Sequence, residues 1–125
     1  MKTKLALELQ AVGNDQFRAN WFYSGFFDST RIFGGHLVAH ALLAAEKTIS
    51  DKSLMPNSLK SHFINPGSTQ GEVLYKVERL KDGKTFTLRG VSAFQNGKLI
   101  FVSQVSFHKP EHGPLSYQID HEKLP

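Results

Sequence analysis

The residues best suited to chemistry lie between positions 28 and 40, in the segment DSTRIFGGHLVAH. Gly34 and Gly35 begin an apolar stretch, and residues without side chains at a helix start let a ligand approach backbone N–H groups that lack partners within the helix. The positive end of the helix dipole lies at the same place. We therefore expect Gly34 and Gly35 either to bind a carbonyl oxygen or to serve close packing alone.

Two histidines follow these glycines at helical spacing. His36 and His40 are four residues apart, so they share one helix face. No third ligand is evident, and Leu37 stands where the glutamate of an H-E-x-x-H motif would be, so we expect neither a metal site nor a cofactor. His36 either polarises a carbonyl group near the helix start or is a hydrogen-bonded structural histidine.

A general base is harder to identify. Asp28 is the only carboxylate close in sequence to the helix start, and it either activates a water molecule or orders the turn before the helix. Ser61 and His62 are adjacent, but they lack the glycine-flanked surroundings of a catalytic serine. The weak catalytic candidates are therefore Gly35, His36 and Asp28.

Composition limits the class of protein. A chain of 125 residues has the length of one domain, and the absence of cysteine excludes disulfides and thiolate chemistry. The net charge is +4, but the basic residues form no polybasic run and no RNA-binding motif, so we expect no nucleic-acid partner. No stretch reaches the roughly 20 apolar residues of a membrane span, and the N-terminus is too polar for a signal peptide.

The elements that must position these residues are one helix and an antiparallel meander. Asp82-Gly83 and Asn96-Gly97 are typical hairpin turns, and they separate three β-rich runs. The pattern predicts strands over 16–22, 58–64, 72–81, 84–95 and 98–109, a helix over 34–49, and an irregular tail over 111–125. A helix that is apolar on every side is a buried helix. We therefore predict an α+β fold in which a long antiparallel sheet wraps around one central helix, forming a single domain over residues 1–110.

Several segments together resemble the first hotdog repeat of the type II acyl-CoA thioesterases. The similarity runs from about Leu5 to Gln118 and rests on the F-G-G start of the helix, the loop FINPG at 63–67 and the turn QNGKLIF at 95–101. The resemblance implies a hotdog fold and, in the full double-hotdog protein, hydrolysis of fatty acyl-CoA to free fatty acid and CoA. It also implies a cytoplasmic or peroxisomal location.

The resemblance places the catalytic residues of that family outside this repeat. An Asp at the helix start, a Thr and a Gln activate water there, and all three belong to the second repeat. This sequence has Gly34, Gly35 and His36 at the matching helix start, and about Ser106 where the second repeat has Gln. The alternative is therefore a catalytically silent hotdog that binds acyl-CoA or forms dimers.

Acyl-CoA as ligand suggests which residues bind it. Arg79, Lys81, Lys84, Arg89 and Lys98 lie on or beside the turns, where they either meet CoA phosphates or form an ordinary solvated edge. The predicted substrate-binding residues are Gly34, Gly35, His36, His62 and Arg89. A lone hotdog repeat leaves a sheet edge uncovered, so we expect a homodimer joined edge to edge, or pairing with a second hotdog domain.

Overall fold

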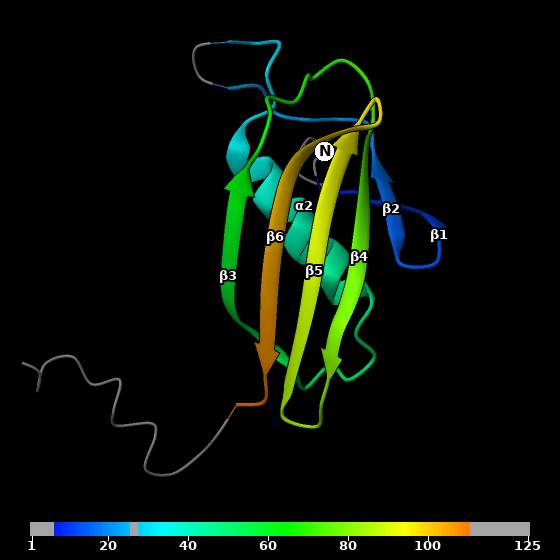
Figure 1. The fold of residues 1–125 in the computed structure, drawn as a ribbon, viewed down its shortest axis with the longest axis vertical. Coiled ribbons are helices and arrows are strands. Elements are labelled where there is room, and N and C mark those ends of the chain that lie inside the picture. The colour runs from blue at the N-terminus through cyan, green and yellow to red at the C-terminus, as the bar shows by residue number, and fades with distance from the viewer. Residues whose placement is uncertain (1–6, 26–27, 111–125) are drawn as a thin grey trace, which may run out of the picture.

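The computed structural model describes residues 7–25 and 28–110, and the tail expected over 111–125 lies outside these ranges. One helix, α2 (Gly34–Lys47), lies behind a single antiparallel sheet (Figure 1). The strands are β1 (Gln10–Gly13), β2 (Gln16–Ala19), β3 (Met55–Phe63), β4 (Val73–Asp82), β5 (Phe86–Gln95) and β6 (Lys98–His108). The α+β architecture is therefore confirmed, whereas the domain boundary at residue 110 stays a prediction.

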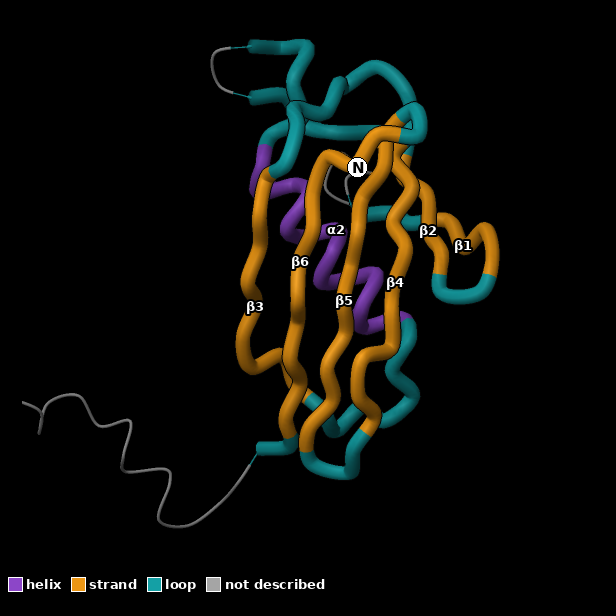
Figure 2. The backbone as a smooth tube through the Cα atoms, in the orientation of Figure 1, coloured by secondary structure: helices purple, strands orange, loops and turns teal. Residues whose placement is uncertain are grey.

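The strands follow the order β1-β2-β4-β5-β6-β3, and every neighbouring pair is antiparallel (Figure 2). The meander β4-β5-β6 agrees with the prediction, and Asn96 and Gly97 adopt the positive φ angles of 52° and 75° that the tight turn between β5 and β6 requires. β1 was not predicted. It pairs with β2 through a turn in which Asp15 has a φ of 55°, and β2 ends at Ala19 rather than at residue 22.

The sheet covers one side of α2 rather than enclosing it. His36, Leu37, His40, Ala41, Ala44 and Ala45 are buried against the sheet. Ala39, Leu42, Leu43 and Glu46 on the outward side are only half-buried. The helix is therefore buried against the sheet, as predicted, while its outward side is half-buried because the sheet covers only one side of it.

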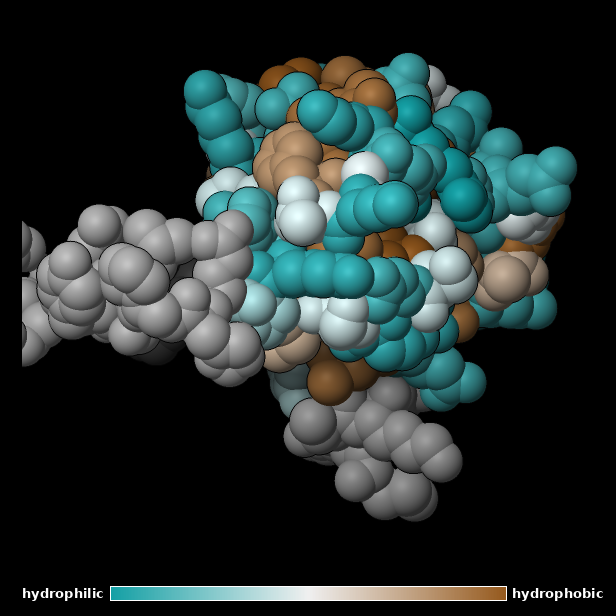
Figure 3. All heavy atoms as spheres, turned by 90° about the horizontal axis from the view of Figure 1, so that it is seen from below, coloured by the Kyte–Doolittle hydropathy of each residue, from teal (hydrophilic) through white to brown (hydrophobic). Residues whose placement is uncertain are grey.

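Charged and polar side chains cover much of the molecule at the end that carries the turn between β4 and β5, with apolar side chains visible between them (Figure 3). No helix among residues 7–25 and 28–110 is long and apolar enough to cross a membrane.

Candidate functional site

A groove lies beside the start of α2, where the helix approaches the end of β3. Its volume is about 380 Å³. The lining residues are Arg31, Ile32, Gly34, Leu37, Phe63, Ile64, Asn65, Pro66 and Gly67. Most of these side chains are apolar, while Arg31 places a guanidinium group at the groove, with 63% of its side chain exposed. The groove therefore combines an apolar wall with one accessible cation.

The FINPG loop is held in place by contacts with the core of the sheet. The Ile32 backbone N–H donates to the Gly67 carbonyl oxygen at 2.9 Å, and the Asn65 side-chain amide donates to the Leu99 carbonyl oxygen at 2.8 Å. A Cβ atom on Gly67 would lie 2.9 Å from Ile32 Cδ1 and 3.0 Å from Ile100 Cδ1, so a larger residue would have to displace these two side chains. The loop is thus a fixed wall of the groove.

The start of α2 offers backbone donors beside this groove. Phe33 occupies the N-cap position and supplies no side-chain hydrogen bond, and the first helical turn contains no acidic residue. The N–H groups of Gly34 and Gly35 therefore have no capping side chain, and the helix dipole adds positive potential there. This arrangement suits the oxygen of a polarised carbonyl group.

Two phenylalanine rings pack against these glycines. A Cβ atom on Gly34 would lie 3.1 Å from the Phe63 ring, and one on Gly35 would lie 2.7 Å from the Phe33 ring. Phe33 and Phe63 are 52% and 58% exposed, so both rings are large apolar surfaces at the helix start. The glycines therefore let both rings lie against the helix start, and a Cβ atom at either position would meet only these exposed rings.

His36 points away from the groove and into the aromatic interior. Its Nδ1 accepts a hydrogen bond of 2.8 Å from the Tyr23 backbone N–H, so the proton of the neutral imidazole lies on Nε2. His40 is fully buried, and its Nδ1 lies 2.9 Å from the Tyr75 hydroxyl. The centroids of the two imidazole rings are 4.3 Å apart. Burial raises the pKa of Tyr75 far above its ordinary value, so its hydroxyl stays protonated.

Asp28 orders the loop that leads into α2. Its Oδ1 accepts hydrogen bonds from the Thr30 backbone N–H at 2.9 Å and from the Thr30 hydroxyl at 2.6 Å, and Oδ2 lies 3.3 Å from Arg31 Nε. These hydrogen bonds and the Arg31 charge lower the pKa of Asp28. A carboxylate with a lowered pKa is a weaker base, so the geometry favours the turn-ordering role.

The predicted substrate-binding residues are not brought together. Gly34 lines the groove and Gly35 follows it, whereas His36 is buried among aromatic rings. His62 is exposed on the face of the sheet that points away from the helix. Arg89 lies near the opposite end of α2.

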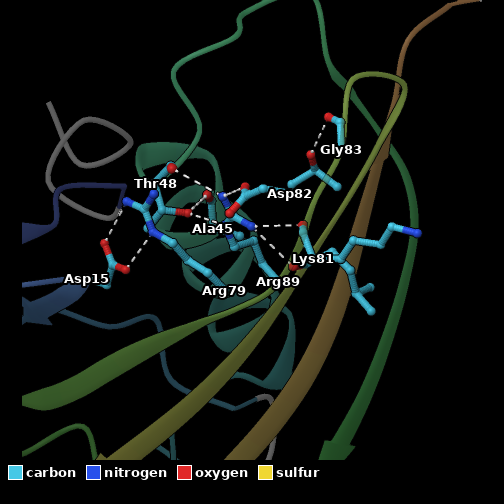
Figure 4. Close-up of polar contacts among 10 residues, drawn as sticks. Asp15, Ala45, Thr48, Arg79, Lys81, Asp82, Gly83 and Arg89 are labelled. Carbon is cyan, nitrogen blue, oxygen red and sulfur yellow. Dashed lines mark hydrogen bonds and ion pairs between the residues drawn. The ribbon is translucent and has the colours of Figure 1, made fainter.

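Arg89 is a buried anchor between the sheet and the helix C-terminus (Figure 4). Only 1% of its surface is exposed. Its Nε donates to the Thr48 hydroxyl at 2.7 Å, and its Nη2 donates to Asp82 Oδ1 at 2.6 Å. The Thr48 hydroxyl in turn donates to the Ala45 carbonyl oxygen at 2.7 Å. The guanidinium group is thus engaged within the chain, at the helix end where a cation is favourable.

Sequence reasoning missed Arg31, Phe63 and Ile64 as groove residues. The FINPG motif could have pointed to these residues, because it marks a loop after a strand. Which end of the helix this loop contacts depends on strand pairing, which the motif does not specify. Among the described residues, no group of three or more histidine or acidic side chains is placed to hold a metal ion.

Comparisons with known proteins place this geometry in context. A family model described as the acyl-CoA thioesterase N-terminal domain matches residues 24–108. Acyl-coenzyme A thioesterase 8 of Homo sapiens is 35% identical over 119 residues, which cover 95% of this chain and 36% of that protein. The peroxisomal acyl-coenzyme A thioester hydrolase 1 of Saccharomyces cerevisiae is 34% identical over 114 residues, covering 89% of this chain and 32% of that protein. The chain thus spans about a third of the length of these relatives.

Solved structures agree with the fold. The tesB protein of Mycobacterium avium subspecies paratuberculosis is 32% identical with a TM-score of 0.78, covering 90% of this chain and 44% of that one. The PaaI protein of E. coli, at 12% identity and a TM-score of 0.71, covers 86% of each chain and shows the likeness of fold alone. The hotdog fold predicted from the sequence is confirmed.

Proposed function

The chain belongs to the acyl-CoA thioesterase family, and from this membership we propose that it is one of two paired hotdog domains that together hydrolyse fatty acyl-CoA. Water attacks the thioester carbonyl carbon, the carbon–sulfur bond breaks, and free fatty acid and CoA thiol leave. The observation that carries the proposal is the groove beside the uncapped start of α2, which joins backbone donors, an apolar wall and an accessible cation.

Each part of the groove has a role in this proposal. The N–H groups of Gly34 and Gly35 donate to the thioester carbonyl oxygen, where each such donor at a developing oxyanion is worth about 3 kcal/mol. Leu37, Phe63 and Ile64 contact the acyl chain, because they are the apolar side chains of the groove. Arg31 binds a CoA phosphate, a role for which its exposed guanidinium group is better placed than buried Arg89.

The partner domain pairs along β3. This strand forms one edge of the sheet, and Met55, Leu59 and Phe63 leave apolar surface exposed along it, at 53%, 36% and 58%. A long edge strand with exposed apolar side chains is a template for pairing with another strand. For this chain by itself we propose a homodimer joined through β3, with the helix-start groove at the junction.

A second candidate function is binding without hydrolysis. The first turn of α2 contains no acidic residue, and Asp28 is already engaged by Thr30 and Arg31. The chain by itself then binds acyl-CoA, and the base that activates water comes from the second hotdog domain, as in the family that the sequence resembles. Both functions fit a cytoplasmic or peroxisomal location.

Two measurements on the same chain separate these functions. Calorimetric titration with a non-hydrolysable thioether analogue of acyl-CoA measures binding. A thiol-reactive chromogen measures CoA release from the thioester, and it has no protein background because the chain contains no cysteine. We expect binding, and release of CoA only when the second hotdog domain is added. Release by the chain alone would assign the base to this chain, and failure to bind the analogue would contradict both functions.

A further inference from the structure

A second cavity, which the proposed function does not use, is lined by the segment before α2 and by the loop between β3 and β4. These segments meet at one end of the molecule (Figure 1). The cavity has a volume of about 380 Å³. Trp21 and Tyr23 supply aromatic walls, and Asn20, Ser29 and Gln70 supply polar groups. None of the described residues that line it is charged. We call this cavity the loop pocket.

The two aromatic rings of the loop pocket form a corner. The ring centroids of Trp21 and Tyr23 are 4.7 Å apart, and the ring planes lie at 82° to each other. Trp21 is half-buried and Tyr23 is 42% exposed, so solvent reaches both. A flat ligand ring that stacks on one of them meets the other edge to face, and both arrangements are favourable for aromatic rings. The corner therefore suits a planar heterocycle.

Backbone contacts hold this corner against the helix start. The Tyr23 N–H donates to His36 Nδ1 at 2.8 Å, and the Tyr23 carbonyl oxygen accepts from the Phe33 N–H at 2.8 Å. On the other side of the loop pocket, the Thr69 hydroxyl donates to the Ser29 carbonyl oxygen at 3.0 Å. Because these segments are already fixed, a ligand would bind without ordering them first.

The polar groups of the loop pocket select the kind of heterocycle. Asn20 and Gln70 are exposed, and no hydrogen bond to another described residue occupies either side-chain amide. An amide donates and accepts side by side, which matches the amino group and the adjacent ring nitrogen of adenine. Guanine is matched by Arg or Lys, and cytosine by Asp or Glu. Two amides without a charged side chain therefore favour adenine.

The loop pocket and the helix-start groove lie on one continuous pair of segments. Ser29 lines the loop pocket, and Arg31, two positions later, lines the helix-start groove. Arg31 forms a β-bridge with Ser68, and the Thr69 N–H donates to the Thr30 carbonyl oxygen at 2.8 Å. In acyl-CoA the phosphates lie between the adenosine and the pantetheine arm that ends in the thioester. The order of loop pocket, Arg31 and helix-start groove matches the order of adenine, phosphate and thioester.

We propose that the loop pocket binds the adenine ring of CoA, stacked in the corner of Trp21 and Tyr23 and hydrogen-bonded by the amides of Asn20 and Gln70. This inference rests on the proposed function, because the thioester end of the same ligand occupies the helix-start groove. It assigns to the segment before α2 the recognition of the nucleotide, a part of the substrate that does not react.

The fluorescence of Trp21 tests the proposal directly. It is the only tryptophan of the chain, so tryptophan emission, excited beyond the absorption of the bases, reports on the loop pocket. Adenosine 3′,5′-bisphosphate, a fragment of CoA, should quench this emission to saturation because its base stacks on the aromatic corner. Guanosine 3′,5′-bisphosphate carries the same phosphates and should bind at least about fivefold more weakly. Equal affinity for the two, or no saturable quenching, overturns the proposal.

Variants of the loop pocket identify the groups responsible. Tyr23→Ala should weaken binding of the thioether analogue of acyl-CoA at least about fivefold in calorimetry, because a stacking surface is lost, whereas Tyr23→Phe keeps the ring and the affinity. Gln70→Ala should reduce the preference for adenine over guanine. Gln104→Ala removes an exposed amide on β6, outside the loop pocket, and should change neither measurement. Circular dichroism checks that each variant is folded.

A thioether analogue of acyl-pantetheine separates this inference from the proposed function, since it lacks both adenine and phosphates. Tyr23→Ala should bind it as tightly as wild type, and an equal loss for both analogues would overturn the adenine site. Unchanged affinity of Tyr23→Ala for the acyl-CoA analogue would also overturn the adenine site, while leaving the proposed function intact. Failure of the wild-type chain to bind the pantetheine analogue, with saturable quenching by adenosine bisphosphate retained, would instead contradict the proposed function and support the adenine site.

Discussion

Arg89 shows how one buried charge determines local structure. The side chain lies within β5, and its hydrogen bonds reach the end of α2 at Thr48 and the end of β4 at Asp82. A buried guanidinium is stable only when its donors are paired. Arg89 therefore joins β5 to its neighbour β4 and to the end of α2, and the contact with Thr48 spans 41 residues of sequence, which no pattern around residue 89 indicates.

Replacing Arg89 separates an anchor from a ligand-binding residue. Arg89→Met should lower the free energy of unfolding by about 2–4 kcal/mol, because hydrogen bonds from a buried charge are lost. Acyl-CoA affinity of the folded variant should not change, as measured by calorimetry below its melting temperature. If the variant kept its stability but bound acyl-CoA more weakly, Arg89 would be a substrate-binding residue after all.

Gly35 gives a second prediction at the scale of a residue. In Gly35→Val the new side chain displaces the exposed Phe33 ring and covers the N–H groups at the helix start. We expect acyl-CoA affinity to fall at least about tenfold, while the melting temperature drops little because the ring is free to move. Gly13→Val is the matched control, since a Cβ atom there has no neighbour closer than 3.9 Å. Equal affinity for both variants would reduce Gly35 to a packing role.

The ion pair between Asp15 and Arg79 gives a pH-dependent prediction. The hydrogen bond from Arg79 lowers the pKa of Asp15 below its ordinary 3.8, so this contribution to stability is complete above that value and is lost as the pH falls through the lowered pKa. Asn tolerates the positive φ of position 15, so Asp15→Asn removes the charge without backbone strain. Its melting temperature should lie below that of wild type near pH 7 and equal it near pH 2. A difference that persists in acid would mean that the charge is not the cause.

For single residues, the sequence predicted position along the helix better than it predicted which residues share a site. Gly34 and Gly35 stand at the helix start as expected, because helix initiation is a local property. His36, His62 and Arg89 are separated by the sheet, since the two faces of a strand and the two ends of a helix are distinguished only by long-range packing. Arg31 lines the groove because its neighbour Ile32 is hydrogen-bonded to Gly67. That contact joins residues 35 positions apart, so local sequence patterns do not indicate it.

The two open edges of the sheet differ in character. β3 is long and has apolar side chains along it. The opposite edge consists of the short strand β1 and of the half of β4 that lies beyond β2, which carries charged residues and a bulge between Arg79 and Lys81. Charges and bulges discourage pairing at an edge. These features favour the proposal that a second hotdog domain pairs at β3.

A single charge on β3 tests this assignment. Leu59→Lys should prevent pairing along β3 and halve the mass of the assembly, because the pairing would bury an ammonium group. The folded chain should tolerate the change, since Leu59 is already 36% exposed. Val12→Lys on β1, where the side chain is 41% exposed, is the matched control at the opposite edge and should leave the mass unchanged. The reverse pattern would place the pairing at β1.

The elements themselves were largely predictable. The strands of the meander were found within two residues of their ends because Asp82-Gly83 and Asn96-Gly97 encode their turns locally. β1 was missed because it is only four residues long and exposed, so it carries no alternating apolar pattern. The helix was expected to be buried because its sequence is apolar all round, but only the position of the sheet decides which side is fully buried.

At the scale of the whole molecule, the β3 edge predicts an assembly of two chains. This edge joins two sheets into one longer sheet, and Phe63 at the end of β3 also lines the groove at the start of α2. The proposed junction and the proposed binding groove therefore lie together, and the wild-type assembly should contain two chains.

The mass of the Leu59→Lys variant tests this stoichiometry. The variant should sediment as a monomer of about 14.0 kDa, because it removes the proposed contact along β3. A Leu59→Lys chain that keeps the wild-type mass would mean that the copies associate through another surface, and the binding groove at the start of α2 would then not lie at their junction.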